Sequence, residues 1–116
     1  MDKIYHLSTC DTCRKILAQL NTENVKLINL REENINEEDL DIMKKQMGSY
    51  EALFNKRAQK LKLIAEDDKP KKDSDYKKLI LSEYTFLKRP AAILDGKVYA
   101  GNDKVTVEQL VAVLGK

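Results

Sequence analysis

The chain has 116 residues, of which 42% are apolar and 34% charged, and this balance is typical of one soluble globular domain. Lysine and arginine number 21 against 19 acidic residues, so a net charge of +2 gives no long-range attraction to nucleic acid or to an anionic membrane, and we expect binding to neither. No apolar run approaches the ~20 residues of a membrane-spanning helix, and the N-terminus lacks the apolar core of a signal peptide. We therefore expect a cytoplasmic protein.

The first third of the chain predicts a strand, a helix and a second strand. β-Branched, aromatic and aliphatic residues favour strands at residues 3–7 and 25–29. Between them, apolar positions over residues 11–21 repeat with the period of one helical face. A strand–helix–strand unit is typical of parallel strand pairing. The helical pattern turns Cys13 toward the core and leaves Cys10 at the start of the helix.

The middle of the chain predicts a helical insert, which we place at about residues 36–84. Asn36 is expected to cap the start of a helix that ends at Gly48, with a short helical turn following at residues 50–54. The polar stretch 55–73 contains three apolar residues that predict a segment folded back against the core: Leu61, Leu63 and Ile64. A further amphipathic helix is indicated by Tyr76, Leu79, Ile80 and Tyr84.

The last quarter predicts an antiparallel hairpin and a closing helix. Residues 91–94 and 97–100 flank Asp95-Gly96, a dipeptide that favours a type I′ turn. Thr106 and Gln109 have the spacing of a capping box and predict a helix start at Thr106.

The predicted order is thus β-α-β, a helical insert, then β-β-α. We expect one α/β domain over residues 1–116 with a four-stranded mixed sheet.

Cys10 and Cys13 are the candidate reactive residues. A disulfide that closes so short a loop adds little stability, and closely spaced cysteines in a non-secreted protein indicate redox or metal chemistry. A helix N-terminus stabilises a thiolate and lowers the cysteine pKa from its usual ~8.5. Cys13, one helical turn later, can attack a mixed disulfide formed at Cys10. We predict that Cys10 is the nucleophile and Cys13 the resolving thiol.

Other roles stay open for these residues. The alternative for Cys13 is a small apolar residue of the core, with an external thiol resolving Cys10. A zinc site needs two further ligands and the chain has a single histidine, His6, so we expect no metal. Taken alone, His6 fits a hydrogen-bonded strand residue. The Arg89-Pro90 bond precedes a strand, and only ~5% of such bonds are cis, so composition leaves its isomer open.

Four segments spread over the chain carry a family pattern: Ile4-Tyr5-His6, Ser8-Thr9-Cys10-Asp11-Thr12-Cys13-Arg14-Lys15, Asn55-Lys56-Arg57 and Lys88-Arg89-Pro90. Together they resemble the ArsC/Spx family, which includes arsenate reductases, Spx redox regulators and YffB-type thiol reductases. The combination is more specific than a lone Cys-x-x-Cys. The resemblance implies a thioredoxin-like fold.

The resemblance also implies roles for five residues. The cysteine that matches Cys10 is the nucleophile, and the arginine that matches Arg89 precedes a structural cis-proline, here Pro90, and holds an oxyanion. Arg57 matches the arginine of the Asn-x-Arg segment of Spx and YffB-type members and is a second candidate for anion binding. His6 matches a histidine that favours the thiolate in arsenate reductases.

Two positions depart from the arsenate reductase pattern. Those enzymes carry a further arginine after the hairpin, where this chain has Val98-Tyr99-Ala100-Gly101. Their middle arginine also aligns better with Asn55 than with Arg57. The arsenate-binding set is therefore incomplete, and we expect weak arsenate turnover.

The resemblance implies two classes of function. The first is an arsenate reductase-like, thiol-dependent oxidoreductase that acts on an oxyanion or a small-thiol mixed disulfide. It would have no tightly bound cofactor, glutathione or another small thiol as co-substrate, and glutaredoxin or thioredoxin as partner. The alternative is an Spx-like redox-sensing regulator that binds the C-terminal domain of the RNA polymerase α subunit, with Gly48 at the partner surface or simply capping its helix. We expect a monomer in either case.

Overall fold

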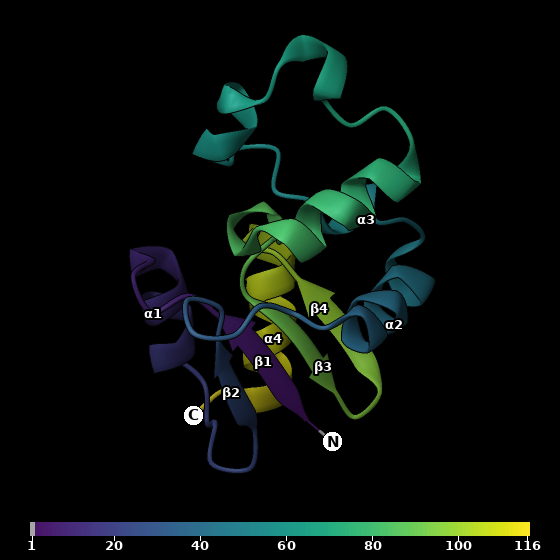
Figure 1. Ribbon diagram of the computed structural model, residues 1–116. Helices are drawn as coiled ribbons and strands as arrows, with labels where there is room; N and C mark the ends of the chain where they lie inside the picture. Colours follow the sequence, from purple (N-terminus) through teal and green to yellow (C-terminus); the bar gives the residue numbers. More distant parts are fainter. Residues whose placement is uncertain (1) are drawn as a thin grey trace. The chain divides into compact units, whose positions relative to one another are not determined.

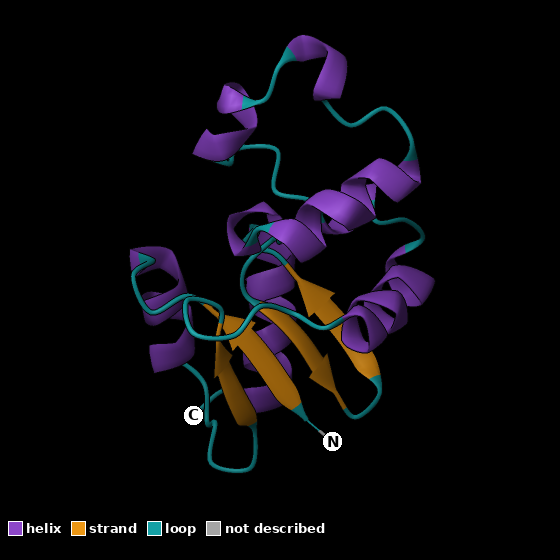
Figure 2. Cartoon of the chain, in the orientation of Figure 1, coloured by secondary structure: helices purple, strands orange, loops and turns teal. Residues whose placement is uncertain are grey.

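The computed structural model describes residues 2–116, and the chain divides into two compact units (Figures 1 and 2). One unit consists of the residues up to Glu33 together with Arg89–Lys116, and the other of Asn34–Lys88. The second unit covers the insert that the sequence placed at about residues 36–84. A single domain over the whole chain stays a prediction.

The first unit is built on a four-stranded mixed sheet, as predicted. Its strands are β1 (Lys3–His6), β2 (Lys26–Asn29), β3 (Ala91–Leu94) and β4 (Lys97–Ala100), in the spatial order β2-β1-β3-β4. β1 pairs parallel with β2 and antiparallel with β3, and β3 pairs antiparallel with β4. This sheet and connectivity make the fold thioredoxin-like.

The hairpin between β3 and β4 has the turn that its sequence predicts. Asp95 has φ 51° and Gly96 has φ 77°. A type I′ turn requires a positive φ at both central residues, and glycine adopts it without strain. The hairpin prediction is therefore confirmed.

Two helices, α1 (Asp11–Ala18) and α4 (Lys104–Leu114), pack their apolar side chains into one core with the sheet. The buried residues of this core are Ile4, Ile16, Leu20, Ala92, Leu94, Tyr99 and Leu110. Cys13 is fully buried, as its helical position predicts. α1 ends three residues before the expected boundary, because Leu20 leaves the helix and forms a β-bridge with Gly115.

The predicted start of the last helix at Thr106 is wrong. α4 begins at Lys104, and Asp103 caps it: its carboxylate accepts the Thr106 N–H at 3.2 Å and the Thr106 hydroxyl at 2.7 Å. A carboxylate is a good acceptor at this end of a helix because it also interacts favourably with the helix dipole. Thr106 thus lies in the first turn rather than at the cap.

The second unit contains α2 (Glu37–Met47), α3 (Asp73–Ser82) and four short 3₁₀ turns: Glu51–Leu53, Gln59–Leu63, Glu66–Asp68 and Tyr84–Phe86. The predicted caps of α2 are confirmed. Asn36 Oδ1 accepts the Asp39 N–H at 2.7 Å, and Gly48 ends the helix with φ 95°. The core of this unit includes Phe54, whose ring stacks on Phe86 with centroids 5.3 Å apart.

The prediction that residues 61, 63 and 64 fold back together against the core is wrong for one of them. Leu63 is 83% exposed, whereas Leu61 and Ile64 are half-buried. A 3₁₀ turn has three residues per turn, so Leu61 and Ile64 share a side and Leu63 points elsewhere. In the described part of the chain, no helix is long and apolar enough to cross a membrane.

Candidate thiol active site

Cys10 is the residue from which α1 starts. It has extended backbone angles, φ −98° and ψ 115°, and its carbonyl accepts the Arg14 N–H at 3.1 Å. The turn before it is closed by a hydrogen bond from the Cys10 N–H to the Leu7 carbonyl, also 3.1 Å. The side chain is half-exposed, so an external reactant can reach the sulfur.

The surroundings of Cys10 favour its thiolate. Burial by itself would raise the pKa of this thiol, but the Cys13 N–H and thiol, the charge of Arg89 and the Thr12 N–H act in the opposite direction. Their combined effect holds the pKa of Cys10 below its ordinary value. Two of these groups are backbone donors of the first helical turn, which have no partner within the helix. The helix start is therefore a site for a negatively charged sulfur.

Cys13 has the opposite tendency. Burial raises its pKa to about 11, and the negative charge of a neighbouring Cys10 thiolate adds to this. Neither cysteine is in a disulfide. The structure therefore places a half-exposed thiol with a lowered pKa one helical turn before a buried thiol with a raised pKa. The roles of nucleophile and resolving thiol stay predictions for these two residues.

Arg89 and Pro90 lie where the chain enters β3. The Arg89-Pro90 peptide bond is cis, and the Pro90 carbonyl accepts the Gly101 N–H at 2.9 Å. Arg89 is half-buried. Its positive charge helps to lower the pKa of Cys10 and offsets a small part of the rise in the pKa of Cys13. A guanidinium can hold an anion through charged hydrogen bonds, and this role of Arg89 stays a prediction.

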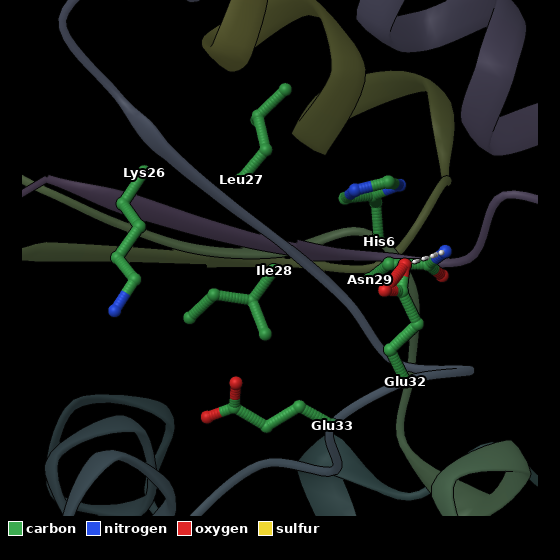
Figure 3. Close-up of a pocket in the computed structure, with 7 residues that line it drawn as sticks. All are labelled: His6, Lys26, Leu27, Ile28, Asn29, Glu32 and Glu33. Carbon is green, nitrogen blue, oxygen red and sulfur yellow. Dashed lines mark hydrogen bonds between the residues drawn. The ribbon is translucent and has the colours of Figure 1, made fainter.

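His6 ends β1 and lines a pocket of about 360 Å³ along β2 (Figure 3). The pocket is lined by His6, Lys26, Leu27, Ile28, Asn29, Glu32 and Glu33. Burial lowers the pKa of His6, and the nearby Glu32 carboxylate only partly opposes this. His6 is therefore largely neutral at pH 7, and a neutral imidazole can favour a thiolate by donating a hydrogen bond but not by charge. Its role toward Cys10 stays a prediction.

Arg57 belongs to the second unit and is exposed there. Its backbone N–H donates to Asn55 Oδ1 at 3.1 Å. Its role in anion binding stays a prediction. Among residues 2–116, no group of three or more histidine, cysteine or acidic side chains is arranged to hold a metal ion.

Sequence reasoning missed Asn29, which contacts the loop that carries Cys10. Its side chain makes two hydrogen bonds to Ser8, although 21 residues separate them along the chain. The signal that could have found it is the parallel pairing of β1 and β2, which aligns Asn29 with His6. The ends of two parallel strands then bring Asn29 to the start of the loop.

The whole chain resembles known proteins in sequence pattern and in fold. The ArsC family model matches residues 5–110. A YffB protein superposes with a TM-score of 0.83 at 19% identity, covering 99% of this chain and 100% of that chain. An arsenate reductase from Vibrio cholerae superposes with a TM-score of 0.74 at 21% identity, and 97% of each chain is covered.

An arsenate reductase-related protein from Brucella melitensis gives a TM-score of 0.67 at 24% identity and covers 93% of this chain and 92% of that chain. At these identities, the solved structures share the fold. A comparison with curated proteins finds no match. Because the family model covers nearly the full length and the Cys10 and Arg89 segments, the chain belongs to the ArsC family.

Proposed function

We propose that this protein is an arsenate reductase-like, thiol-dependent oxidoreductase in which Cys10 is the nucleophile and Cys13 the resolving thiol. The observation that carries the proposal is the position of Cys10 at the start of α1, where the Cys13 N–H and thiol, Arg89 and the Thr12 N–H outweigh burial and lower its pKa. The thiolate is the reactive species in thiol exchange, and a lowered pKa increases the fraction of Cys10 in that form.

The proposed reaction with a small-thiol mixed disulfide has two exchange steps. The Cys10 thiolate attacks one sulfur of R–S–S–R′, forms Cys10–S–S–R and expels R′–S⁻, which takes up a proton. Cys13 then loses its proton and attacks the Cys10 sulfur, forming the Cys10–Cys13 disulfide and releasing R–S⁻. The substrate has gained two electrons and the protein has lost two. Two molecules of glutathione, or a reduced glutaredoxin or thioredoxin, return them and are oxidised to the disulfide.

The first step prepares Cys13 for the second. In the reduced protein, the Cys10 thiolate helps to raise the pKa of Cys13. When Cys10 becomes part of a mixed disulfide, that negative charge is gone, and the pKa of Cys13 falls. Burial, the larger cause, still holds the pKa of Cys13 above its ordinary value, so the first step lowers the barrier to deprotonation of Cys13 only in part.

Two substrate classes fit this chemistry, a mixed disulfide and an oxyanion. With arsenate, the same two electrons would reduce As(V) to As(III), with one oxygen lost as water. Oxyanion capture needs several charged hydrogen bonds, and the segment that follows the hairpin turn, Val98-Tyr99-Ala100-Gly101, supplies no arginine. The lack of this arginine therefore favours a mixed disulfide with a small thiol over arsenate as the substrate.

Treatment with glutathione disulfide tests the function by the products that accumulate. We expect the wild-type protein to lose two hydrogens and to retain no glutathione, because a cysteine pair three positions apart on a helix start is within bridging reach. Intact-mass spectrometry with peptide mapping would locate the bond between Cys10 and Cys13. Glutathione retained on Cys10 of the wild-type protein would show that Cys13 does not resolve the intermediate. Absence of any reaction at Cys10 would contradict the proposed function.

A second candidate function is a redox-sensing regulator that binds the C-terminal domain of the RNA polymerase α subunit. The adjacency of Cys10 and Cys13 is the observation that favours it, because an oxidisable pair can act as a switch as well as a catalyst. Gly48 already has a structural role, since its positive φ ends α2. A pull-down with that domain, with the chain reduced and oxidised, distinguishes the two: binding that depends on the oxidation state supports the regulator.

A further inference from the structure

The side chain of Asn29 uses its full hydrogen-bonding capacity at the end of β2. Its Oδ1 accepts the N–H groups of Ser8 and Arg31, both at 3.2 Å. Its Nδ2 donates to Ser8 Oγ at 2.9 Å and to Glu32 Oε1 at 3.3 Å; the latter bond is drawn in Figure 3. An amide has two donors and two acceptor lone pairs, so each of them is occupied.

The third polar group of Ser8, its carbonyl, is hydrogen-bonded by a side chain of α1. This carbonyl accepts Nη1 of Arg14 at 3.1 Å, and the same guanidinium also pairs with Asp11 in the first turn of α1. Ser8 is therefore fixed on one side by the end of β2 and on the other by the helix that Cys10 starts. The register of the sheet supports this arrangement, because the Leu30 N–H donates to the His6 carbonyl at 2.7 Å just beyond the strand ends.

We propose that Asn29 is a positioning residue for the nucleophile: by clamping Ser8 to the end of β2, it fixes the loop that places the Cys10 sulfur at the start of α1. This inference rests on the proposed function of Cys10. The physical reason is that hydrogen bonds weaken steeply with distance and angle. A sulfur displaced from the Cys13 and Thr12 N–H groups loses part of the stabilisation of its thiolate.

The Asn29→Ala variant tests the proposal through the chemistry of Cys10. The expected result is a raised pKa of Cys10 and alkylation by iodoacetamide at pH 7 that is about three- to tenfold slower, the loss expected when about one hydrogen bond no longer orients the loop. The measurement is the rate of Cys10 alkylation over a pH series. Ser8→Ala removes only the Oγ acceptor and should give a smaller change in the same direction, so it provides a milder variant should Asn29→Ala fail to fold.

Asn34→Ala is the matched control. The Asn34 side chain makes three hydrogen bonds in the second unit, with the Ile80 and Leu81 carbonyls at 3.0 and 3.2 Å and the Ile35 N–H at 2.8 Å. Removal of the Asn34 side chain should lower the free energy of unfolding by about as much as removal of the Asn29 side chain does. The Cys10 pH profile should stay at the wild-type position. A shift of equal size in both variants would mean that the effect is a general loss of stability and would overturn the proposal.

Released charge is the competing explanation, because Asn29 also binds Glu32. A freed carboxylate that moved toward Cys10 would raise the pKa of the thiol without any change in the loop. The Asn29→Ala/Glu32→Gln double variant removes that charge. If the profile returns to wild type, Asn29 acts through Glu32 and the positioning role is wrong. If the shift persists, the clamp on Ser8 is its cause.

Alkylation requires no substrate, so this test is separate from that of the proposed function. A protein that reacts with no disulfide would disprove the oxidoreductase while still reporting whether Asn29 sets the ionisation of Cys10. An unchanged Cys10 profile in both Asn29→Ala and Ser8→Ala would overturn the positioning role even for an active enzyme.

Discussion

Replacing Cys10 with serine is expected to abolish turnover of mixed disulfides, with a loss on the order of a thousandfold or more, because a serine hydroxyl is not ionised near neutral pH and cannot form the mixed disulfide. Steady-state reduction of a glutathione mixed disulfide measures this loss. The Cys13→Ser variant is the matched control. It should keep the first step and accumulate glutathione on Cys10. Equal activity of Cys10→Ser and wild type would place the nucleophile elsewhere.

Replacing Arg89 with alanine is expected to weaken anion binding at Cys10 by about ten- to a hundredfold, the usual consequence of losing one charged hydrogen-bonding partner. The same change should raise the pKa of Cys10, since the charge of Arg89 helps to lower it. Protection of Cys10 from alkylation by sulfate or arsenate measures the binding. Arg89→Lys keeps the positive charge but should restore anion binding only in part, because an ammonium lacks the planar fork of a guanidinium.

Lys71→Ala controls for the loss of a positive charge in general, because Lys71 is exposed in the second unit. Its anion protection should equal that of the wild type. Turnover of arsenate with glutathione and glutaredoxin should be weak in all of these proteins, since the arginine after the hairpin is absent. Robust arsenate turnover by the wild type, or equal losses in Arg89→Ala and Lys71→Ala, would mean that the anion site is misplaced.

The elements that the sequence predicted correctly depend on local chemistry. The hairpin follows from the Asp95-Gly96 turn, and the boundaries of α2 follow from Asn36 and Gly48. The start of α4 was missed because Asp103 and Thr106 are both good caps, and residue type alone does not choose between them. Leu63 was misplaced because apolar residue type alone does not say which side of a segment faces the core, and the 3₁₀ turn formed here puts Leu63 on a different side from Leu61.

The site divides in the same way. The spacing of Cys10 and Cys13 is local, so their exposed and buried positions could be predicted from the helix. The lowered pKa of Cys10 could be predicted from its place at a helix start, but the opposing effect of burial and the contribution of Arg89, which is distant in the sequence, depend on the spatial arrangement. Asn29 lies at the end of β2 and bonds to Ser8, which follows the end of β1. No local sequence pattern predicts this contact.

The pH dependence of alkylation at Cys10 in the wild-type protein tests the central claim most directly. The cysteines are labelled with iodoacetamide over a pH series, and each is quantified by peptide mapping. We predict a midpoint for Cys10 below ~8.5, the usual value for a free thiol, with Cys13 unmodified until far higher pH because its pKa is about 11. A midpoint for Cys10 at or above that usual value, or preferential labelling of Cys13, would contradict the assignment of Cys10 as the nucleophile.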